Sequence, residues 1–274
     1  MGSHTPCPLF SMEEARLLRV DTKCVADDET IDRHIVHALS LNLPVLGQHF
    51  EHDGVAVLIG SGPSVETQLD SIKRQRVKGR PLIAIKDAHD WLIEHGIVPD
   101  YAIAIDPQEH RWACFMRKHP DVKYFIASQC HPKMFEHLAG HHVWLFHLVH
   151  QNGQSYPPKT VMIGGGTTTG MRAITLFYTL GFNRFELYGY DSCLSPTLRL
   201  RVTETEHNGQ PILPVKVGER TFLCNPAMAV QAQHFQKIFT EGQMPDLVIQ
   251  SHGDGLISAI LDAREAAARQ LVTA

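Results

Sequence analysis

The sequence has no apolar run long enough to cross a bilayer, and no apolar leader segment follows its first residues. A membrane-spanning helix needs ~18 or more consecutive apolar residues, and a secretory signal needs an apolar stretch near the start of the chain. A polybasic stripe is also missing, since the formal net charge is −4 over 274 residues. These absences predict a cytoplasmic protein that binds neither membranes nor nucleic acid.

Cysteine is sparse, and its spacing carries no motif. The chain has six cysteines, and no two of them form a C-x-x-C pair. Redox motifs, structural zinc sites and disulfide frameworks need cysteines at short or regular spacings, so we expect reduced thiols. Histidine is abundant at 18 residues, yet the H-E-x-x-H pattern of zinc-dependent hydrolases is absent.

The two best-known phosphate-binding motifs are missing as well. In "VLIGSGPSVE", Gly60 and Gly62 are followed by Val65 where the dinucleotide fingerprint G-x-G-x-x-G has its third glycine. Residues 165–170 have the glycine spacing of a P-loop, but Met171 follows them in place of lysine. The sequence therefore argues against a nicotinamide or flavin cofactor and against a Walker-type ATPase.

Apolar segments alternate with helical patterns along most of the chain. Apolar runs predict strands at 55–59, 81–86, 100–106, 122–128, 142–149, 160–166, 184–191 and 246–251. Helical patterns occupy 31–41, 64–76, 88–95, 168–180, 226–240 and the end of the chain. Strands that alternate with helices build parallel sheets. We therefore predict an α/β, Rossmann-like fold with a mainly parallel sheet and helices on both faces.

The chain divides into a short N-terminal part and one large domain. We expect a helical lead-in over residues 1–50 and the Rossmann-like domain over residues 51–274. Within that domain, residues 195–224 break the rhythm, because "LRLRVTE", "PILPVKV" and "RTFLCN" are short β-like runs separated by the turn signals "HNGQ" and "VGER". This segment predicts a small antiparallel β insertion.

A glycine loop follows the first predicted strand. It consists of Gly60, Ser61, Gly62, Pro63 and Ser64, and the proline and serine at its end supply a helix start. Backbone N–H groups at such a strand-to-helix turn favour anions. The loop therefore predicts phosphate binding, although a plain sharp turn has the same composition.

Other strand ends carry residues that suit a nucleotide. The sixth strand runs into a second loop with Gly165, Gly166, Thr167 and Thr168. Asp106 and Asp191 each follow an apolar strand, where they act either as caps or turn residues or as ligands of Mg²⁺ on a polyphosphate. In a parallel sheet all these ends lie on one rim, where ligands bind.

Three further residues are candidates for catalysis. His252 and Asp254 lie in the glycine loop "SHGDG" after the last strand, and Arg172 begins the helix after the second glycine loop. Histidine suits a general base, whereas Arg172, together with Lys86 at the end of the second strand, suits charge neutralisation. Each of them also fits an ordinary turn or surface position.

The segments "VLIGSGPSVE", "LIEHGIVPDYAIAID" and "GGGTTTGMRAITLFYTLGFNRFELYGYDSC" resemble three blocks of the MptE-like (DUF115) family. That family includes the archaeal 6-hydroxymethyl-7,8-dihydropterin diphosphokinase, and it is related to the motility accessory factor glycosyltransferases. The resemblance covers residues 52–194, and "SHGDGL" is similar to a closing motif of these proteins. The insertion at 195–224 and "NPAMAVQAQHFQ" have no counterpart in the pattern.

The resemblance implies a Rossmann-like domain that binds a nucleotide, either ATP as diphosphate donor or a CMP-activated sugar. It also implies roles for the loops and acidic strand ends. Residues 60–64 form the phosphate-facing first loop, residues 165–168 form the second loop, and Asp106 and Asp191 are the acidic strand ends, with Mg²⁺ as the expected metal.

Two functions follow from this resemblance, and a third, of another class, stays open beside them. The favoured one is a diphosphokinase-like transfer from ATP to a small hydroxymethyl acceptor such as a pterin, because 274 residues leave little room for the large helical additions of the motility transferases. The alternatives are glycosyl transfer from a CMP-sugar, with His252 as base, and a noncatalytic nucleotide-binding accessory protein. The sequence leaves homo-oligomerisation open.

Overall fold

The computed structural model describes residues 26–49, 51–149, 156, 160–203, 209–240, 244 and 246–273, with the side chains of the last helix described up to residue 270. The first half of the expected lead-in therefore lies outside the described residues. From the remainder comes α2 (Asp28–Ser40). None of the described helices has the length and apolar character that a membrane span requires.

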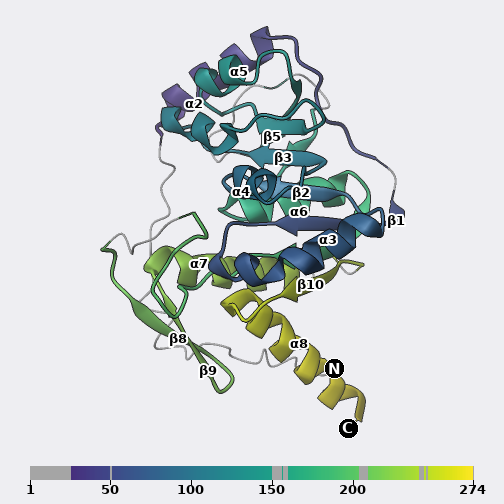
Figure 1. Ribbon diagram of the computed structural model, residues 1–274, viewed down its shortest axis with the longest axis vertical. Helices are drawn as coiled ribbons and strands as arrows, with labels where there is room; N and C mark the ends of the chain where they lie inside the picture. The colour runs from purple at the N-terminus through teal and green to yellow at the C-terminus, as the bar shows by residue number, and fades with distance from the viewer. Residues whose placement is uncertain are drawn as a thin grey trace, which may run out of the picture.

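The centre of the molecule is an eight-stranded sheet (Figure 1). Its strands are β1 (His52–Ile59), β2 (Leu82–Ile85), β3 (Tyr101–Ala104), β4 (Lys123–Ala127), β5 (His142–Leu148), β6 (Met162–Ile163), β7 (Phe182–Tyr188) and β10 (Val248–His252). They lie in the order β10-β7-β1-β2-β3-β4-β5-β6. Every pairing is parallel, which confirms the predicted α/β fold.

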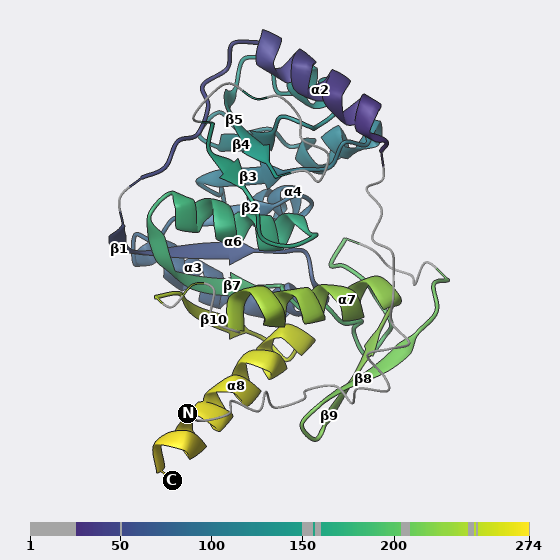
Figure 2. The same cartoon turned by 180° about the vertical axis from the view of Figure 1, so that it is seen from behind.

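Helices cover both faces of this sheet. The elements are η1 (Pro63–Gln68), α3 (Leu69–Val77), α4 (Ala88–Glu94), η2 (Glu109–Phe115), α5 (Pro132–His137), α6 (Thr169–Thr179), α7 (Pro226–Phe235), η3 (Gln236–Thr240) and α8 (Leu256–Thr273). Helices α3 and α4 lie in front of the sheet in Figure 1. Helices α6 and α7 lie on the opposite face, which Figure 2 brings to the front.

The apolar residues of β1 are buried on both faces of the sheet. Val57 and Ile59 are fully buried in a cluster that includes residues of α3 and α4. Ala56 and Leu58 belong to the other cluster, which includes residues of α6. Successive side chains of a strand point to opposite faces, so an uninterrupted apolar run is required where both faces are covered.

Two helices begin at the carboxyl edge of the sheet with side-chain caps. Thr168 accepts a hydrogen bond from the Met171 N–H at the start of α6. Asn225 accepts one from the Met228 N–H at the start of α7, and Pro226 occupies the first turn. Such caps satisfy one of the free donors of a helix start and stabilise it by about 1 kcal/mol. The two caps therefore fix the residues at which α6 and α7 begin at this edge of the sheet.

The insertion contains one antiparallel hairpin. Strands β8 (Leu213–Val217) and β9 (Arg220–Cys224) pair across a turn in which Gly218 has φ +59°. This confirms the predicted antiparallel insertion, which lies beside the main sheet in Figures 1 and 2. The expectation of a third β-like run at 198–204 is wrong for its described part, because residues 198–203 form turns and bends that cross the edge of the parallel sheet.

Candidate functional site

A cleft of about 560 Å³ opens at the carboxyl edge of the sheet. Its walls come from the ends of β1, β2, β3 and β7, the loop before α6, the insertion and the start of α7. They include Gly60, Ser61, Gly62, Lys86, Asp106, Arg111, Thr167, Thr168, Asp191 and Arg201. The fold therefore brings parts of both glycine loops and both acidic strand ends to one cavity, as expected where parallel strands end.

The first glycine loop uses most of its backbone donors internally. The Gly60 N–H donates to the carbonyl of Tyr188, the last residue of β7, at 2.8 Å, and the Gly62 N–H donates to the Gly189 carbonyl at 2.9 Å. The Ser64 N–H donates to Asp191 at 2.8 Å, and the proline before it has no N–H. Within the described part of the chain, Ser61 alone among residues 60–64 keeps an N–H without a protein acceptor. The first loop is therefore a poor phosphate cradle.

The glycines of this loop allow close packing against the end of β7. A Cβ atom at Gly62 would lie 2.6 Å from both the Gly189 carbonyl oxygen and Asp191 Oδ2. A Cβ atom at Gly60 would also lie 2.6 Å from the Gly189 oxygen. Contacts that short do not occur between real atoms, so the glycines are required for protein packing whether or not a ligand approaches.

Asp191 holds the first loop in place. Its carboxylate is buried and accepts the Ser64 N–H at Oδ2 and the Ser64 hydroxyl at Oδ1, the latter at 2.5 Å. Its own carbonyl accepts the Leu256 N–H at 2.8 Å, which ties α8 to the same point. Burial raises the pKa of Asp191, and the two bonds from Ser64 oppose that rise. The carboxylate acts primarily as an anchor between three segments.

The second glycine loop leaves its donors unused. Gly165 and Gly166 adopt φ values of +90° and +92°, a left-handed backbone that glycine tolerates best. No protein acceptor among the described residues takes up the N–H groups of residues 165–170. Residues 167–170 of this run line the cleft, at the start of the 11-residue helix α6. A loop of free N–H groups at a helix start attracts anions.

Cationic side chains face the same cleft. Lys86 forms an ion pair with Asp106 at 2.6 Å, and its own backbone is left-handed with φ +49°. Arg111 donates to Gln108 at 3.2 Å through Nε. Arg201 also lines the cleft. Among the described residues that line the cleft, the cationic side chains of Lys86, Arg111 and Arg201 outnumber the carboxylates of Asp106 and Asp191, so the lining is suitable for an anion.

His252 lies in a different environment from the cleft. Its Nε2 atom is 2.5 Å from Glu186 Oε2, and its ring stacks on Tyr188 with 4.2 Å between centroids. Arg80 donates to the other oxygen of Glu186 at 2.8 Å. The histidine thus contacts a carboxylate of β7 that Arg80 also contacts, and it is not among the residues that line the cleft.

Asp254 and Arg172 also lie outside the cleft lining. Asp254 is exposed, and its backbone carbonyl accepts a hydrogen bond from Arg220 at 2.7 Å. Arg172 donates to the Ile163 carbonyl at 2.6 Å, and burial lowers the pKa of its guanidinium. In this position Arg172 links α6 to the end of β6.

The 6-hydroxymethylpterin diphosphokinase MptE-like family matches residues 34–197, which is more than half of the chain. The chain belongs to this family. The matched region contains both glycine loops, Asp106 and Asp191, and it ends where the insertion begins.

A solved structure resembles this MptE-like chain in fold. It is the MAf glycosyltransferase from Magnetospirillum magneticum AMB-1, with a TM-score of 0.64 at 14% identity. The similarity covers 93% of this chain but 44% of that one, so the MptE-like chain spans less than half the length of the glycosyltransferase. At this identity the likeness concerns the fold. No curated protein gives a significant match.

The carboxylates of the cleft are the groups of this MptE-like protein that would hold magnesium. No group of three or more metal-ligating side chains occurs in the part of the chain that the structure describes. Asp191 has both oxygens bonded to Ser64, whereas Asp106 is bonded to Lys86 through Oδ2 alone among the described contacts. Mg²⁺ on a polyphosphate needs one or two carboxylates and keeps several waters. Asp106 fits such an ion better than Asp191.

Two cationic residues of the cleft lining, Arg111 and Arg201, were not predicted from the sequence. Arg111 lies in η2, a short 3-10 segment without a recognisable period. Arg201 lies in the insertion, beyond the family match. The one signal that could have found them is the rule that loops after neighbouring parallel strands share one rim.

Proposed function

We propose that this MptE-like protein is a nucleotide-dependent transferase that moves a diphosphate from ATP to the hydroxymethyl group of a small acceptor such as a pterin. The family match supports transferase chemistry. The observation that carries the proposal is the run of residues 167–170, whose N–H groups have no acceptor among the described residues and which lines a cleft that also contains Lys86, Arg111 and Arg201. Free donors and cations are what a polyphosphate requires.

The reaction needs positioning and charge neutralisation more than covalent catalysis. The acceptor hydroxyl oxygen forms a bond to the β-phosphorus of ATP, and the bond from that phosphorus to the oxygen shared with the α-phosphate breaks. AMP leaves with that oxygen, and the hydroxyl proton passes to solvent. The N–H groups of residues 167–170 hold phosphate oxygens, and Lys86 with Arg111 offsets their charge. A bound Mg²⁺, held at Asp106, would add to that neutralisation.

A second candidate is glycosyl transfer from a CMP-activated sugar. It is favoured by one observation, the fold shared with a solved MAf glycosyltransferase over 93% of this chain. His252, the base proposed for this reaction, is bonded to Glu186. A noncatalytic nucleotide-binding protein is the third candidate, and it would bind nucleotide in the same cleft without turnover.

A product assay separates these candidates. The protein is incubated with ATP, Mg²⁺ and 6-hydroxymethyl-7,8-dihydropterin, and AMP and the acceptor diphosphate are quantified by chromatography. We expect the two products in equal amounts. CMP release from a CMP-sugar would favour the glycosyltransferase instead. Calorimetric binding of ATP, CTP or CMP without any product would favour the accessory protein.

A further inference from the structure

Residues 194–203, which lead into the insertion and form its first part, make a strap across the edge of the sheet where the cleft opens. The strap starts at Leu194, whose N–H donates to the Leu223 carbonyl at 2.7 Å and so pairs with the end of β9. Further along, the Val202 N–H donates to the Ser61 carbonyl at 2.8 Å. The strap is therefore hydrogen-bonded directly to the first glycine loop.

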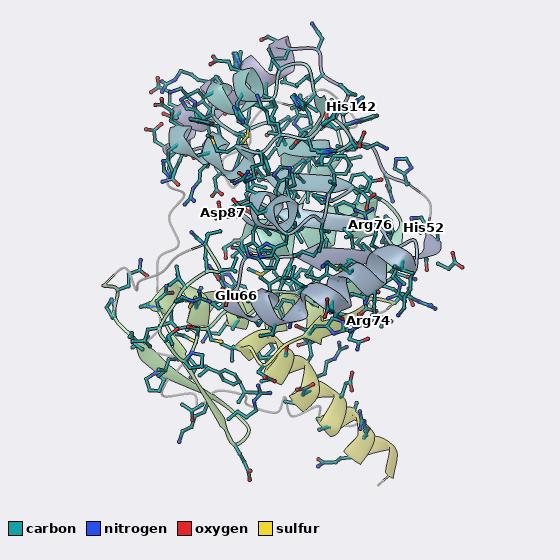
Figure 3. The ribbon with its side chains drawn as sticks, in the orientation of Figure 1. His52, Glu66, Arg74, Arg76, Asp87 and His142 are labelled. Carbon is teal, nitrogen blue, oxygen red and sulfur yellow. The ribbon has the colours of Figure 1, made fainter. Side chains whose placement is uncertain are left out.

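Two ion pairs show the course of the strap. Arg199 is bonded to Glu66 in η1, and Arg201 lies 3.8 Å from Asp87, which follows β2. Since β7, β1 and β2 are neighbours in the sheet, the strap passes from β7 over the end of β1 to the end of β2. Figure 3 shows Glu66 and Asp87 on the same side of the molecule as the insertion, with Arg74 and Arg76 toward the opposite edge.

The strap thereby brings a cation to the end of β2. Arg201 and Lys86 both line the cleft. Lys86 directly precedes Asp87, the residue with which Arg201 forms its ion pair. Helix α6, whose start carries the free N–H groups, packs against β1, β2 and β3. The end of β2 thus combines a lysine from the sheet and an arginine from the insertion in a cleft that also contains the α6 N-terminus.

The ion pair of Arg201 with Asp87 is suited to exchange. At 3.8 Å it is longer than the 2.6 Å pair of Lys86 with Asp106. Its side chains are 30% and 21% exposed, and partly exposed pairs at such distances contribute little to stability. A phosphate carries more charge than a carboxylate and accepts two parallel bonds from a guanidinium.

We propose that Arg201 is a substrate-binding residue that contacts the distal phosphates of the nucleotide. Lys86 and Arg201 together hold the diphosphate that is transferred, while residues 167–170 hold the phosphate nearer the nucleoside. This inference rests on the proposed function, because it assumes an oligophosphate in the cleft. It gives the insertion, which lies beyond the family match, a role in selecting that substrate.

The test compares two arginines of the same strap. Arg201→Met removes the cleft cation, and Arg199→Met removes a cation that pairs with Glu66 and is not part of the cleft lining. Binding of ATP, AMP and inorganic triphosphate is measured by calorimetry. A charge-assisted hydrogen bond contributes about 1.5–3 kcal/mol, so Arg201→Met should weaken ATP and triphosphate binding by about 10- to 100-fold. AMP binding should be unchanged.

The outcomes distinguish this inference from the proposed function. Arg199→Met should bind all three ligands like the wild type, and Arg201→Lys should recover part of the lost affinity. If the wild type binds ATP but Arg201→Met binds it equally well, or loses AMP affinity to the same extent, the role of Arg201 is wrong and the proposed function stands. If the wild type binds neither ATP nor triphosphate, the proposed function itself fails.

Discussion

Replacing Thr167 with aspartate is expected to weaken ATP binding by ~100-fold or more while leaving the fold intact. Thr167 is exposed, lines the cleft and precedes the capping residue of α6. The Thr167 hydroxyl lies 3.3 Å from His234 Nδ1, and a carboxylate in its place would put a negative charge at the wall of the cleft, where two like charges ~4 Å apart near a protein surface repel by about 4 kcal/mol. Calorimetric titration with ATP measures this loss.

The thermal stability of Thr167→Asp should be equal to or higher than that of the wild type, although its ATP affinity falls. A negative charge near a helix N-terminus stabilises it by about 0.3–1 kcal/mol, so the aspartate variant should melt at or above the wild-type temperature. Thr167→Asn is the matched control, because it has the same shape without the charge and should retain most of the affinity. Full ATP binding by Thr167→Asp would show that the second loop does not hold the phosphates.

A single methyl group at Gly62 is expected to destabilise the protein by about 3 kcal/mol. Gly62 has an extended backbone with φ −60° and ψ 148°, which alanine adopts without strain. The cost arises because the new Cβ would lie 2.6 Å from a backbone oxygen and from the bonded carboxylate of Asp191. Neither can move without breaking a hydrogen bond of the first loop, and overpacking typically costs about 1–3 kcal/mol.

Urea denaturation of Gly62→Ala measures this effect, with Gly47→Ala as the control. A Cβ atom at Gly47 meets nothing within 4 Å, so that variant should be as stable as the wild type or slightly more stable. A Gly62→Ala protein of wild-type stability that has lost only its ATP affinity would contradict the packing role. It would mean that the glycine serves the ligand.

Much of the fold could be predicted because parallel strands with two covered faces need uninterrupted apolar runs. Each of the eight strands of the large sheet falls within or overlaps such a run. Helix α5 was missed because its six residues, "PKMFEH", are too few to show a helical period. The segment 198–203 alternates like a strand, yet it crosses the strand ends and pairs with no strand in the described region.

The site was harder to predict because its chemistry depends on distant partners. Both glycine loops have the composition of a phosphate loop. The first loop differs from the second because most of its N–H groups already have protein acceptors. The Ser64 N–H donates to Asp191, 127 residues away, and the Gly62 N–H donates to the Gly189 carbonyl, directly after β7. His252 likewise ends its strand as expected, but its ring faces Glu186 and Tyr188. A single sequence does not contain these pairings.

Amide hydrogen exchange with and without ATP tests the central claim, that the second glycine loop and the start of α6 hold the nucleotide's phosphates. Exchange is slow where an N–H has an acceptor and fast where it has none. We expect ATP to protect residues 165–170, whose N–H groups lack protein acceptors in the described structure. Residues 60, 62 and 64 are already bonded and should change little. New protection at these first-loop residues, with none at 165–170, would contradict the account.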